Sequence, residues 1–590
     1  MKRLLYNFLT ILVIALFAAS CGELPNPDNG EQNQQNQVDD NGGESGGGST
    51  EDPGNQPGGE GGGQQESQGT GGVVEPTGGS TIYGIVTCEG NGVPGVVVSD
   101  GIEVVTTDEY GIYQIPSRKK YRYVWISVPS GYEVPSEGVL PHFWEPLVVG
   151  ASTPERHDFT LTHTGSDDFT LYVLGDMHLA RRTNDLVQFR AFAEDLNATI
   201  NATEGKEYVI TLGDMTWDCY WYVNNFGLGN YLDEVNADFS GIQFWHTMGN
   251  HDNDMDRSGD FNKEQPYRDI LTPTFYSFNL GLFHVIVMDN IDYTNISAGE
   301  GNRKYYAVDI TREQFDWMKK DLAHVAKSTP LFITMHAPVF KPVSGESYSF
   351  KAGLTGTSGV QNNEFLKALE GYQVHFFTGH THNTCNYVNP YNGLYEHNSG
   401  AVCADWWWSG KESGVLVAQD GAPSGYTIVK ASGRKLTWRY KAAGYPIDYQ
   451  FRSYDMNEVK KVVKPAIASN KKGFNTYISA MSKYSSNDVL LNIWYWDPQW
   501  IITVTEEGTP LEVQSVWEYD PLHIIAYTAP RYCKTDDPTF PTELWTHFFK
   551  VHASSPTSTL QITVRDRFGN VYTETMQRPK AFSVETYKAR

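Results

Sequence analysis

Five short apolar runs in the middle of this 590-residue chain each lead into polar side chains, and this pattern restricts the fold more than any other feature. The runs span residues 171–175, 208–213, 244–249, 331–335 and 374–377. Each has the length of a strand, and helical patterns separate them, so we expect an α/β domain over residues 166–445. In such sheets ligands bind at the carboxyl ends of the strands, which is where the polar side chains fall.

The polar residues that follow the runs are imidazoles, carboxylates and one amide. In chain order they are Asp176, His178, Asp214, Asn250, His336, His380 and His382. Any one of these patterns alone is more typical of a turn, a helix cap or a polar loop. Five together predict a metal site, and nitrogen and oxygen ligands without thiolates suit zinc, manganese or iron. Seven ligands exceed one tetrahedral site but fit two metal ions that share a bridging carboxylate.

The motifs around these residues read GDMH, GDMTWD, GNHD, MHAP and GHTH, and in this order they resemble the calcineurin-like metallophosphoesterase superfamily. The resemblance implies two mixed sheets packed face to face, with helices outside. It also implies that Asp214 bridges two metals and that His251 contacts the substrate phosphate and assists the leaving group. The remaining ligands would then divide into Asp176, His178 and His382 on one metal and Asn250, His336 and His380 on the other.

The activity that the resemblance implies is that of a hydrolase acting on ester bonds, a phosphatase or phosphodiesterase. Such an enzyme hydrolyses phosphate mono- or diesters by in-line attack of a metal-bound hydroxide at a two-metal centre. Purple acid phosphatases share this layout but lack His178 and use a tyrosine where this chain has Trp217, so a tyrosinate–iron site is not expected. Asp218 and Asp252 are expected to support or cap the site. The alternative is a vestigial centre in an envelope protein that serves binding or adhesion.

Strand patterns flank the predicted catalytic domain on both sides. Residues 80–165 are broken by turns such as Asp100-Gly101, which predicts an N-terminal β-sandwich that resembles carboxypeptidase-regulatory-like modules. Residues 446–590 revert to strands, which predicts a second all-β sandwich. The whole chain is similar to a group of exported bacterial calcineurin-like proteins with such N-terminal and C-terminal β modules, whose physiological substrate the resemblance does not fix.

The N-terminus carries the pattern of an exported protein. A basic start and an apolar stretch over residues 8–19 precede Cys21, so residues 1–21 are expected to be a lipoprotein signal that ends at this lipidated cysteine. An ordinary secretory signal is the alternative. Residues 22–79 are acidic and rich in Gly and Gln, without an aromatic residue, which predicts a disordered tether. The expected location is the bacterial cell envelope, lipid-anchored at the outer membrane or cell surface.

The net charge indicates which kinds of partner the protein can bind, and the cysteine spacing indicates whether disulfides or thiolate metal sites are expected. The net charge is −25, and the chain has no Lys/Arg block, so a nucleic-acid surface is not expected. The expected partners are a phosphate-ester substrate and, through the lipid anchor, a membrane. Apart from Cys21 the cysteines are widely spaced and contain no Cys-x-x-Cys, which indicates neither a disulfide framework nor a thiolate zinc site.

Three consecutive tryptophans, Trp406, Trp407 and Trp408, follow soon after the last metal motif. Because neighbouring side chains on a strand alternate between faces, three in a row cannot all face one core. One interpretation is packing, with Trp406 and Trp408 inward and Trp407 in the seam with the C-terminal sandwich. The other is that at least one indole lines the pocket and holds a flat or sugar-bearing leaving group.

Overall fold

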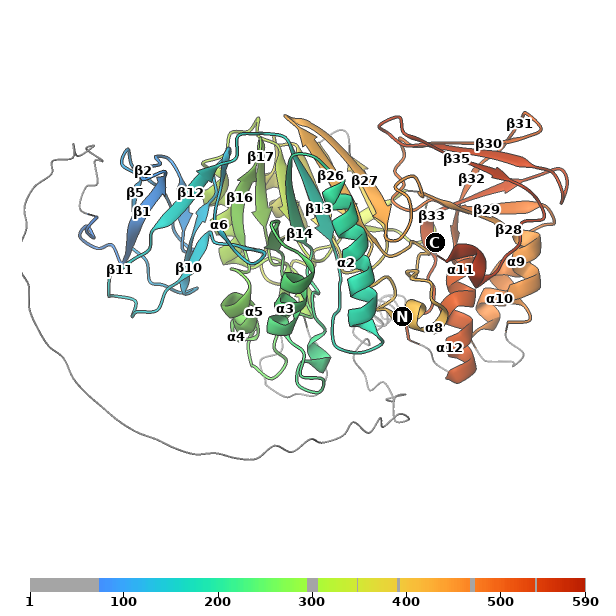
Figure 1. The fold of residues 1–590 in the computed structure, drawn as a ribbon, viewed down its shortest axis with the longest axis horizontal. Coiled ribbons are helices and arrows are strands. Elements are labelled where there is room, and N and C mark those ends of the chain that lie inside the picture. Colours follow the sequence, from blue (N-terminus) through green and yellow to red (C-terminus); the bar gives the residue numbers. More distant parts are fainter. Residues whose placement is uncertain are drawn as a thin grey trace, which may run out of the picture.

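The computed structural model describes residues 74–293, 306–346, 348–389, 393–466, 473–535 and 539–588. Three modules lie in a row along its long axis, in chain order (Figure 1). The predicted signal peptide, Cys21 and most of the predicted tether lie outside the described residues. The last residues of the predicted tether, 74–79, belong instead to the N-terminal module, because Glu75 and Thr77 form hydrogen bonds with Gln114.

The N-terminal module consists of strands packed as a sandwich. Its strands are β1 (Ile82–Cys88), β2 (Asn91–Gly92), β3 (Val97–Ser99), β4 (Val104–Thr106), β5 (Ile112–Ile115), β6 (Tyr123–Ser127), β7 (Tyr132–Glu133), β8 (Ser136–Glu137), β9 (Leu140–Pro141), β10 (Trp144–Pro146), β11 (Glu155–Arg156) and β12 (Phe159–His163). They form a six-stranded sheet around β1, a four-stranded sheet of order β10-β6-β3-β4 and the hairpin β8-β9. Alternate residues of β1 are buried, as expected of a strand with one face on a core.

The core of this module continues into the middle domain. The Trp125 ring packs 6.0 Å from Phe275 and 5.8 Å from Trp317, centroid to centroid. One hydrophobic cluster therefore includes residues of both modules. Burial of these large rings fixes the N-terminal module against the middle domain.

The middle domain is built on two mixed sheets. Its strands are β13 (Phe169–Leu174), β14 (Lys206–Thr211), β15 (Gln243–His246), β16 (Tyr276–Leu280), β17 (Phe283–Val287), β18 (Ile291–Tyr293), β19 (Tyr306–Val308), β20 (Leu331–Thr334), β21 (Phe340–Pro342), β22 (Phe350–Ala352), β23 (Val374–Thr378), β24 (Cys385–Asn389), β25 (Leu394–Asn398), β26 (Gly425–Ser432) and β27 (Lys435–Ala442). The first sheet has the order β15-β14-β13-β26-β27 and the second β16-β17-β20-β23-β25-β24. In the first sheet β15, β14 and β13 are parallel, and β26 and β27 continue it in antiparallel pairing. In the second sheet β17, β20, β23 and β25 are parallel, and β16 and β24 form antiparallel edges. The five apolar runs of the sequence are β13, β14, β15, β20 and β23.

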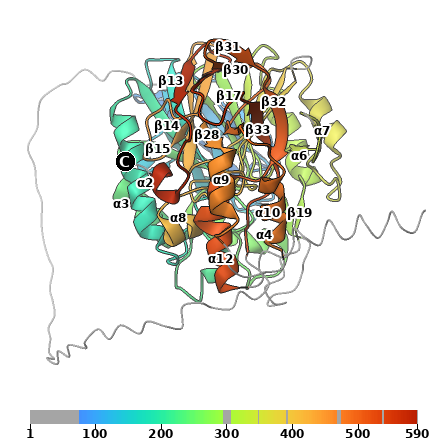
Figure 2. The same ribbon diagram turned by 90° about the vertical axis from the view of Figure 1, so that its right-hand side faces the viewer.

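Helices connect the strands of these sheets. They are α2 (Asp185–Asn201), η2 (Asp218–Tyr220), α3 (Leu228–Asp238), α4 (Asp260–Lys263), α5 (Gln265–Ile270), α6 (Arg312–Leu322), α7 (Asn362–Ala368) and α8 (Trp408–Ser413). Figure 2 shows α2 and α3 on one side of the domain and α6 and α7 on the other. At the start of α6 the Thr311 hydroxyl accepts the Gln314 amide at 3.4 Å, whereas the Gln314 side chain bonds the backbone of Asp289 instead of closing a capping box.

The C-terminal module is not all-β, which corrects the prediction for residues 446–590. Its strands are β28 (Arg452–Asp455), β29 (Asp488–Asn492), β30 (Ile501–Glu506), β31 (Thr509–Leu511), β32 (Gln514–Glu518), β33 (Trp545–His552), β34 (Leu560–Arg565) and β35 (Val571–Met576). Its helical segments are α9 (Met456–Val463), α10 (Asn475–Ser482), α11 (Pro521–His523), η3 (Ile524–Thr528), α12 (Ala529–Lys534) and η4 (Val584–Tyr587). The sheets have the orders β28-β29-β33-β32 and β31-β30-β34-β35.

The helices of this module cover one face of its first sheet. On β29, Leu490 points into the core formed with the helices, whereas Val489 and Leu491 point into the core between the two sheets. The strand is thus buried on both faces, because side chains alternate along it. The helix α9 begins at the Asp455 carboxylate, which accepts the Asn457 amide at 3.1 Å.

No helix among the described residues combines the length and the apolar character that a bilayer span requires.

Candidate metal centre

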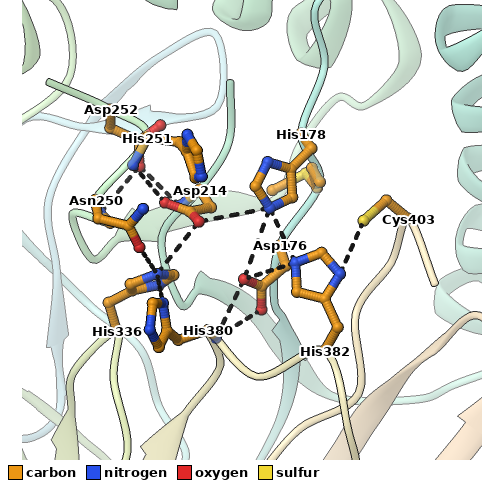
Figure 3. A network of polar contacts seen from close by, with 12 residues as sticks. Asp176, His178, Asp214, Asn250, His251, Asp252, His336, His380, His382 and Cys403 are labelled. Atoms are coloured by element: carbon orange, nitrogen blue, oxygen red, sulfur yellow. Dashed lines mark hydrogen bonds and ion pairs between the residues drawn. The ribbon is translucent and has the colours of Figure 1, made fainter. Parts of the chain in front are cut away.

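The carboxyl ends of five strands, from both central sheets, bring the seven predicted ligands to one place (Figure 3). In strand order they are Asp176 and His178 after β13, Asp214 after β14, Asn250 after β15, His336 after β20, and His380 and His382 after β23. His380 is partly exposed and the other six are buried. Because buried carboxylates are costly unless a positive charge compensates them, such a cluster is suited to cations.

Asp176, His178 and His382 form the first group of ligands. The Nε2 atoms of His178 and His382 lie 3.0 Å apart, and the Oδ1 atom of Asp176 lies 3.5 Å from the His382 Nε2 atom. The Oδ2 atom of Asp214 lies 3.4 Å from the His178 Nε2 atom. The nitrogen and oxygen atoms of these four side chains therefore face one another.

Asn250, His336 and His380 form the second group. The Oδ1 atom of Asn250 lies 2.9 Å from His336 Nε2, and His380 Nδ1 lies 3.1 Å from the same atom. The Oδ2 atom of Asp214, which faces the first group, also lies 3.3 Å from His336 Nε2. Asp214 thus stands between the two groups and contacts both through one oxygen (Figure 3).

These separations fit metal coordination. Ligand atoms about 2.1 Å from one ion lie roughly 3.0–3.4 Å from each other in octahedral or tetrahedral geometry, which covers most of the distances above. Ligand atoms of His178, Asp214 and His251 lie within 4.8 Å of one another, and so do those of Asp214, His336 and His380. Two imidazole nitrogens that face each other at 3.0 Å also need a proton or a cation between them.

Backbone carbonyls orient two of the imidazoles. The Nδ1 atom of His336 lies 2.7 Å from the carbonyl oxygen of Leu212, and that of His382 lies 2.8 Å from the carbonyl of Ala404. Because each carbonyl accepts a hydrogen bond, it places the proton on Nδ1 and leaves the Nε2 lone pair toward the centre. This arrangement is the usual support of a histidine that binds a metal.

Burial sets the charge of the centre. It lowers the pKa of His382 to about 3 and holds the pKa values of His178 and His380 well below the ordinary value, so these imidazoles are neutral, as ligands must be. Burial raises the pKa of the Asp176 carboxyl to about 8. Burial lowers the pKa of His336, but the Asp214 charge outweighs it and raises this pKa to about 9. Burial likewise opposes ionisation of Asp214, whose pKa the His336 charge holds well below the usual range. A metal bound at His336 Nε2 would displace the proton that this pairing favours. A bound cation would favour the ionised form of both carboxylates.

Five of the ligands adopt a left-handed backbone conformation, which side chains other than glycine rarely do. Their φ angles are 51° at Asp176, 47° at His178, 54° at Asp214, 69° at His380 and 58° at His382. Each such residue costs about 1–2 kcal/mol. Strain of this kind is concentrated at functional sites, where the surrounding structure holds it in place.

Two glycines allow the backbones of β14 and β15 to meet beneath Asp214. A Cβ atom on Gly249 would lie 2.3 Å from the Asp214 amide nitrogen, and one on Gly213 would lie 2.7 Å from the Gly249 Cα atom. Gly213 also has a φ of +90°. A side chain at either position would push the strand ends apart, which explains why glycine precedes the polar residues here.

His251 lies beside the metal ligands and is held by Asp218. Its Nδ1 atom lies 2.9 Å from Asp218 Oδ1, and its backbone N–H donates to Asp214 Oδ1 at 2.7 Å. Asp252 accepts hydrogen bonds from the backbone amides of Asp214, Gly249 and Thr216. Asp218 and Asp252 therefore support the loops of the centre, in the places expected for them.

The three tryptophans occupy three different environments. The partly exposed Trp406 ring stacks on His382, with centroids 3.8 Å apart. Trp407 is buried in the core of the middle domain, where its Nε1 donates to the Met177 carbonyl at 2.8 Å. Trp408 is buried between the guanidinium groups of Arg182 and Arg531. Trp408 and Trp406 therefore contact the C-terminal module, whereas Trp407, which was expected there, does not lie at this contact.

Sequence reasoning missed two residues next to the centre. The Sγ atom of Cys403 lies 3.6 Å from His382 Nδ1 (Figure 3), and burial raises the pKa of this thiol, so it stays protonated. Phe540 of the C-terminal module stacks on Trp406 at 3.7 Å. Neither residue lies in a motif, and Phe540 is far from the metal ligands along the chain, so nothing local in the sequence marks them.

Several solved structures are similar to parts of this chain at low identity. A dimetal phosphatase from Danio rerio is 13% identical and has a TM-score of 0.33, with 47% of this chain and 96% of that chain covered. The structure named PhoD is 11% identical, with a TM-score of 0.35 and coverage of 68% and 83%. A 5'-nucleotidase from Candida albicans is 12% identical, with a TM-score of 0.28 and coverage of 47% and 51%. No curated protein matches the chain.

Family models match all three modules. Residues 169–384 match the model described as calcineurin-like phosphoesterase. Residues 80–164 match the N-terminal model of calcineurin-like phosphoesterase, and residues 396–572 match the C-terminal one. The chain therefore belongs to the calcineurin-like phosphoesterase superfamily.

Proposed function

We propose that the protein hydrolyses phosphate mono- or diesters at a centre of two metal ions. The observation that carries this proposal is the position of Asp214, whose Oδ2 atom contacts one imidazole of each ligand group, at 3.4 and 3.3 Å. A carboxylate between two sets of nitrogen and oxygen ligands is the arrangement that a shared pair of cations requires. Manganese, iron and zinc all suit these ligands.

Asp176, His178 and His382 would hold one ion, and Asn250, His336 and His380 the other, with Asp214 shared. When bound, the two ions would supply the positive charge that an anionic ester needs before water can attack it. Asn250 contributes a neutral oxygen, which limits the negative charge of the centre and so favours an anionic substrate.

We propose that His251 stabilises the leaving oxygen of the ester. Asp218 Oδ1 lies 2.9 Å from the His251 Nδ1 atom, which fixes the orientation of the ring. A protonated imidazole would donate a proton or a hydrogen bond from Nε2 to the departing alkoxide. The His251 ring lies 4.9 Å from the ring of His178, so the donor stands at the edge of the metal ligands.

Turnover of p-nitrophenyl phosphate and bis-p-nitrophenyl phosphate by the manganese-loaded protein tests the proposal. We expect hydrolysis of at least one ester, inhibition by a chelator and recovery on adding metal back. If the protein binds two equivalents of metal and turns over neither ester, the phosphoesterase proposal fails.

We also propose that the protein is lipid-anchored at the bacterial cell envelope through Cys21. The support is the sequence of residues 1–21, with its basic start, apolar stretch and small residues before the cysteine. A lipid anchor would place the catalytic domain outside the cytoplasm, where extracellular phosphate esters would be its substrates.

A further inference from the structure

The C-terminal module reaches the metal centre through Phe540. The Phe540 ring stacks on Trp406 with a centroid distance of 3.7 Å and an interplanar angle of 17°. Trp406 stacks in turn on His382, at 3.8 Å and 24°. Because two rings cannot occupy one face of an indole at these distances, Phe540 and His382 cover opposite faces of Trp406.

This stack changes the role expected of Trp406. Both faces of its indole are covered, so it cannot stack on a substrate, although its edge is partly exposed. Phe540 has one face against Trp406 and is itself partly exposed. Its next ring neighbour is Trp217, with centroids 6.5 Å apart. Trp406 therefore serves as the support on which the Phe540 ring rests.

Trp217 links this stack to the side of the centre where His251 lies. Trp217 lies 5.7 Å from His251 and 5.4 Å from His178, centroid to centroid. The guanidinium of Arg182 lies 4.8 Å from the Trp217 ring, which holds this indole by a cation–π contact. The group proposed to serve the leaving oxygen thus contacts Trp217, whose ring neighbours include Phe540.

Phe540 is held in a strained backbone conformation, with a φ angle of 57°. For a bulky residue this left-handed conformation is rare and requires support from its neighbours. The support is present on both sides, since the Tyr527 hydroxyl donates to the Thr539 carbonyl at 3.0 Å and the Gln419 side chain donates to the Pro541 carbonyl at 2.8 Å. Gln419 belongs to the middle region of the chain, so both modules fix the position of this ring.

We propose that the partly exposed Phe540 ring, with the buried Trp217 beside it, forms the surface that binds the leaving group, and that the preferred substrates are phosphate esters of aromatic alcohols. This inference rests on the proposed function. A flat ring gains stacking with Phe540 that a small aliphatic group does not, and because the Phe540 ring is already fixed it loses little conformational freedom on binding. The C-terminal module would then determine specificity as part of the active site.

Binding of two phosphonates, which cannot be hydrolysed as esters, tests the inference by titration calorimetry on the metal-loaded protein. We expect phenylphosphonate to bind more tightly than methylphosphonate, and Phe540→Ala to reduce this preference by about tenfold. Phe540→Leu, which keeps apolar volume without a ring, should give an intermediate loss. Phe568→Ala is the matched control, because Phe568 also packs on a tryptophan of the middle domain, Trp438 at 4.8 Å, but away from the metal ligands.

The inference is overturned if Phe540→Ala and Phe540→Leu weaken both phosphonates equally, or weaken neither, because Phe540 would then only pack against Trp406. It is also overturned if Phe568→Ala changes the preference as much as Phe540→Ala does. Failure of the proposed function looks different: the wild-type protein would hydrolyse no ester and bind neither phosphonate, and the inference would fall with it. If the wild-type protein hydrolyses esters but the Phe540 variants keep the same preference for phenylphosphonate over methylphosphonate, the inference is wrong and the proposed function stands.

Discussion

Replacing Asp214 by asparagine should weaken both metal sites together. Asparagine keeps the volume of the side chain and an Oδ1 acceptor for the His251 amide, which donates to Asp214 at 2.7 Å. The change therefore affects mainly the Oδ2 position, where an amide N–H would face the nitrogen atoms of His178 and His336, now 3.4 and 3.3 Å away. A ligand that both ions share is thus lost without removing a side chain.

The expected magnitude follows from this position. Loss of a residue that only supports a metal ligand costs about 10–100-fold in affinity, so loss of the ligand should cost at least about 100-fold, or ~2.7 kcal/mol, at each site. Metal content by elemental analysis, after loading with manganese and gel filtration, checks this for both ions. Asp321→Asn is the control, because Asp321 is also a buried carboxylate beside a histidine, 2.8 Å from His284 Nε2, but lies outside the centre. Loss of one equivalent only would refute the bridging role, and retention of both would refute a ligand role altogether.

His251→Ala should lower turnover about 10²–10⁴-fold with unchanged metal content, as expected of an acid outside the metal ligands; a loss of metal would make His251 a ligand instead. Trp407→Phe should cost about 1–3 kcal/mol in urea unfolding, because it leaves the buried Met177 carbonyl without its 2.8 Å hydrogen bond; an unchanged midpoint would show that this bond contributes nothing. Cys21→Ser should abolish lipid attachment and release the protein from membranes, and a variant that still sediments with salt-washed membranes would argue against the lipoprotein signal.

The catalytic fold was predictable because its signals are local. Each strand of the centre is a short apolar run, and each ligand follows it within a few residues, as in the step from β23 to His380 and His382. Glycines such as Gly213 mark the places where the strand ends must approach each other, since a Cβ atom there would collide with Gly249. Order along the chain was therefore enough to indicate which side chains meet.

The contacts between modules were not predictable in the same way. The stack of Phe540, Trp406 and His382 joins segments that are distant along the chain, and no spacing rule connects them. The carbonyl of Ala404 that orients His382 depends on a turn whose shape no motif specifies. The helix α9 of the C-terminal module did have local signals in the sequence. Asp455 is a favourable cap, and Val459 and Val463, which are buried in the structure, are spaced four residues apart as on one face of a helix. The strand patterns on either side led to the prediction of an all-β module instead.

Anomalous diffraction from a manganese-soaked crystal tests the central claim, a pair of metal ions at the ends of the five strands. We expect two peaks about 3.5–4 Å apart, with the Asp214 carboxylate between them. One peak should lie against Asp176, His178 and His382, and the other against Asn250, His336 and His380. A single peak, or two peaks that do not share Asp214, would contradict the claim.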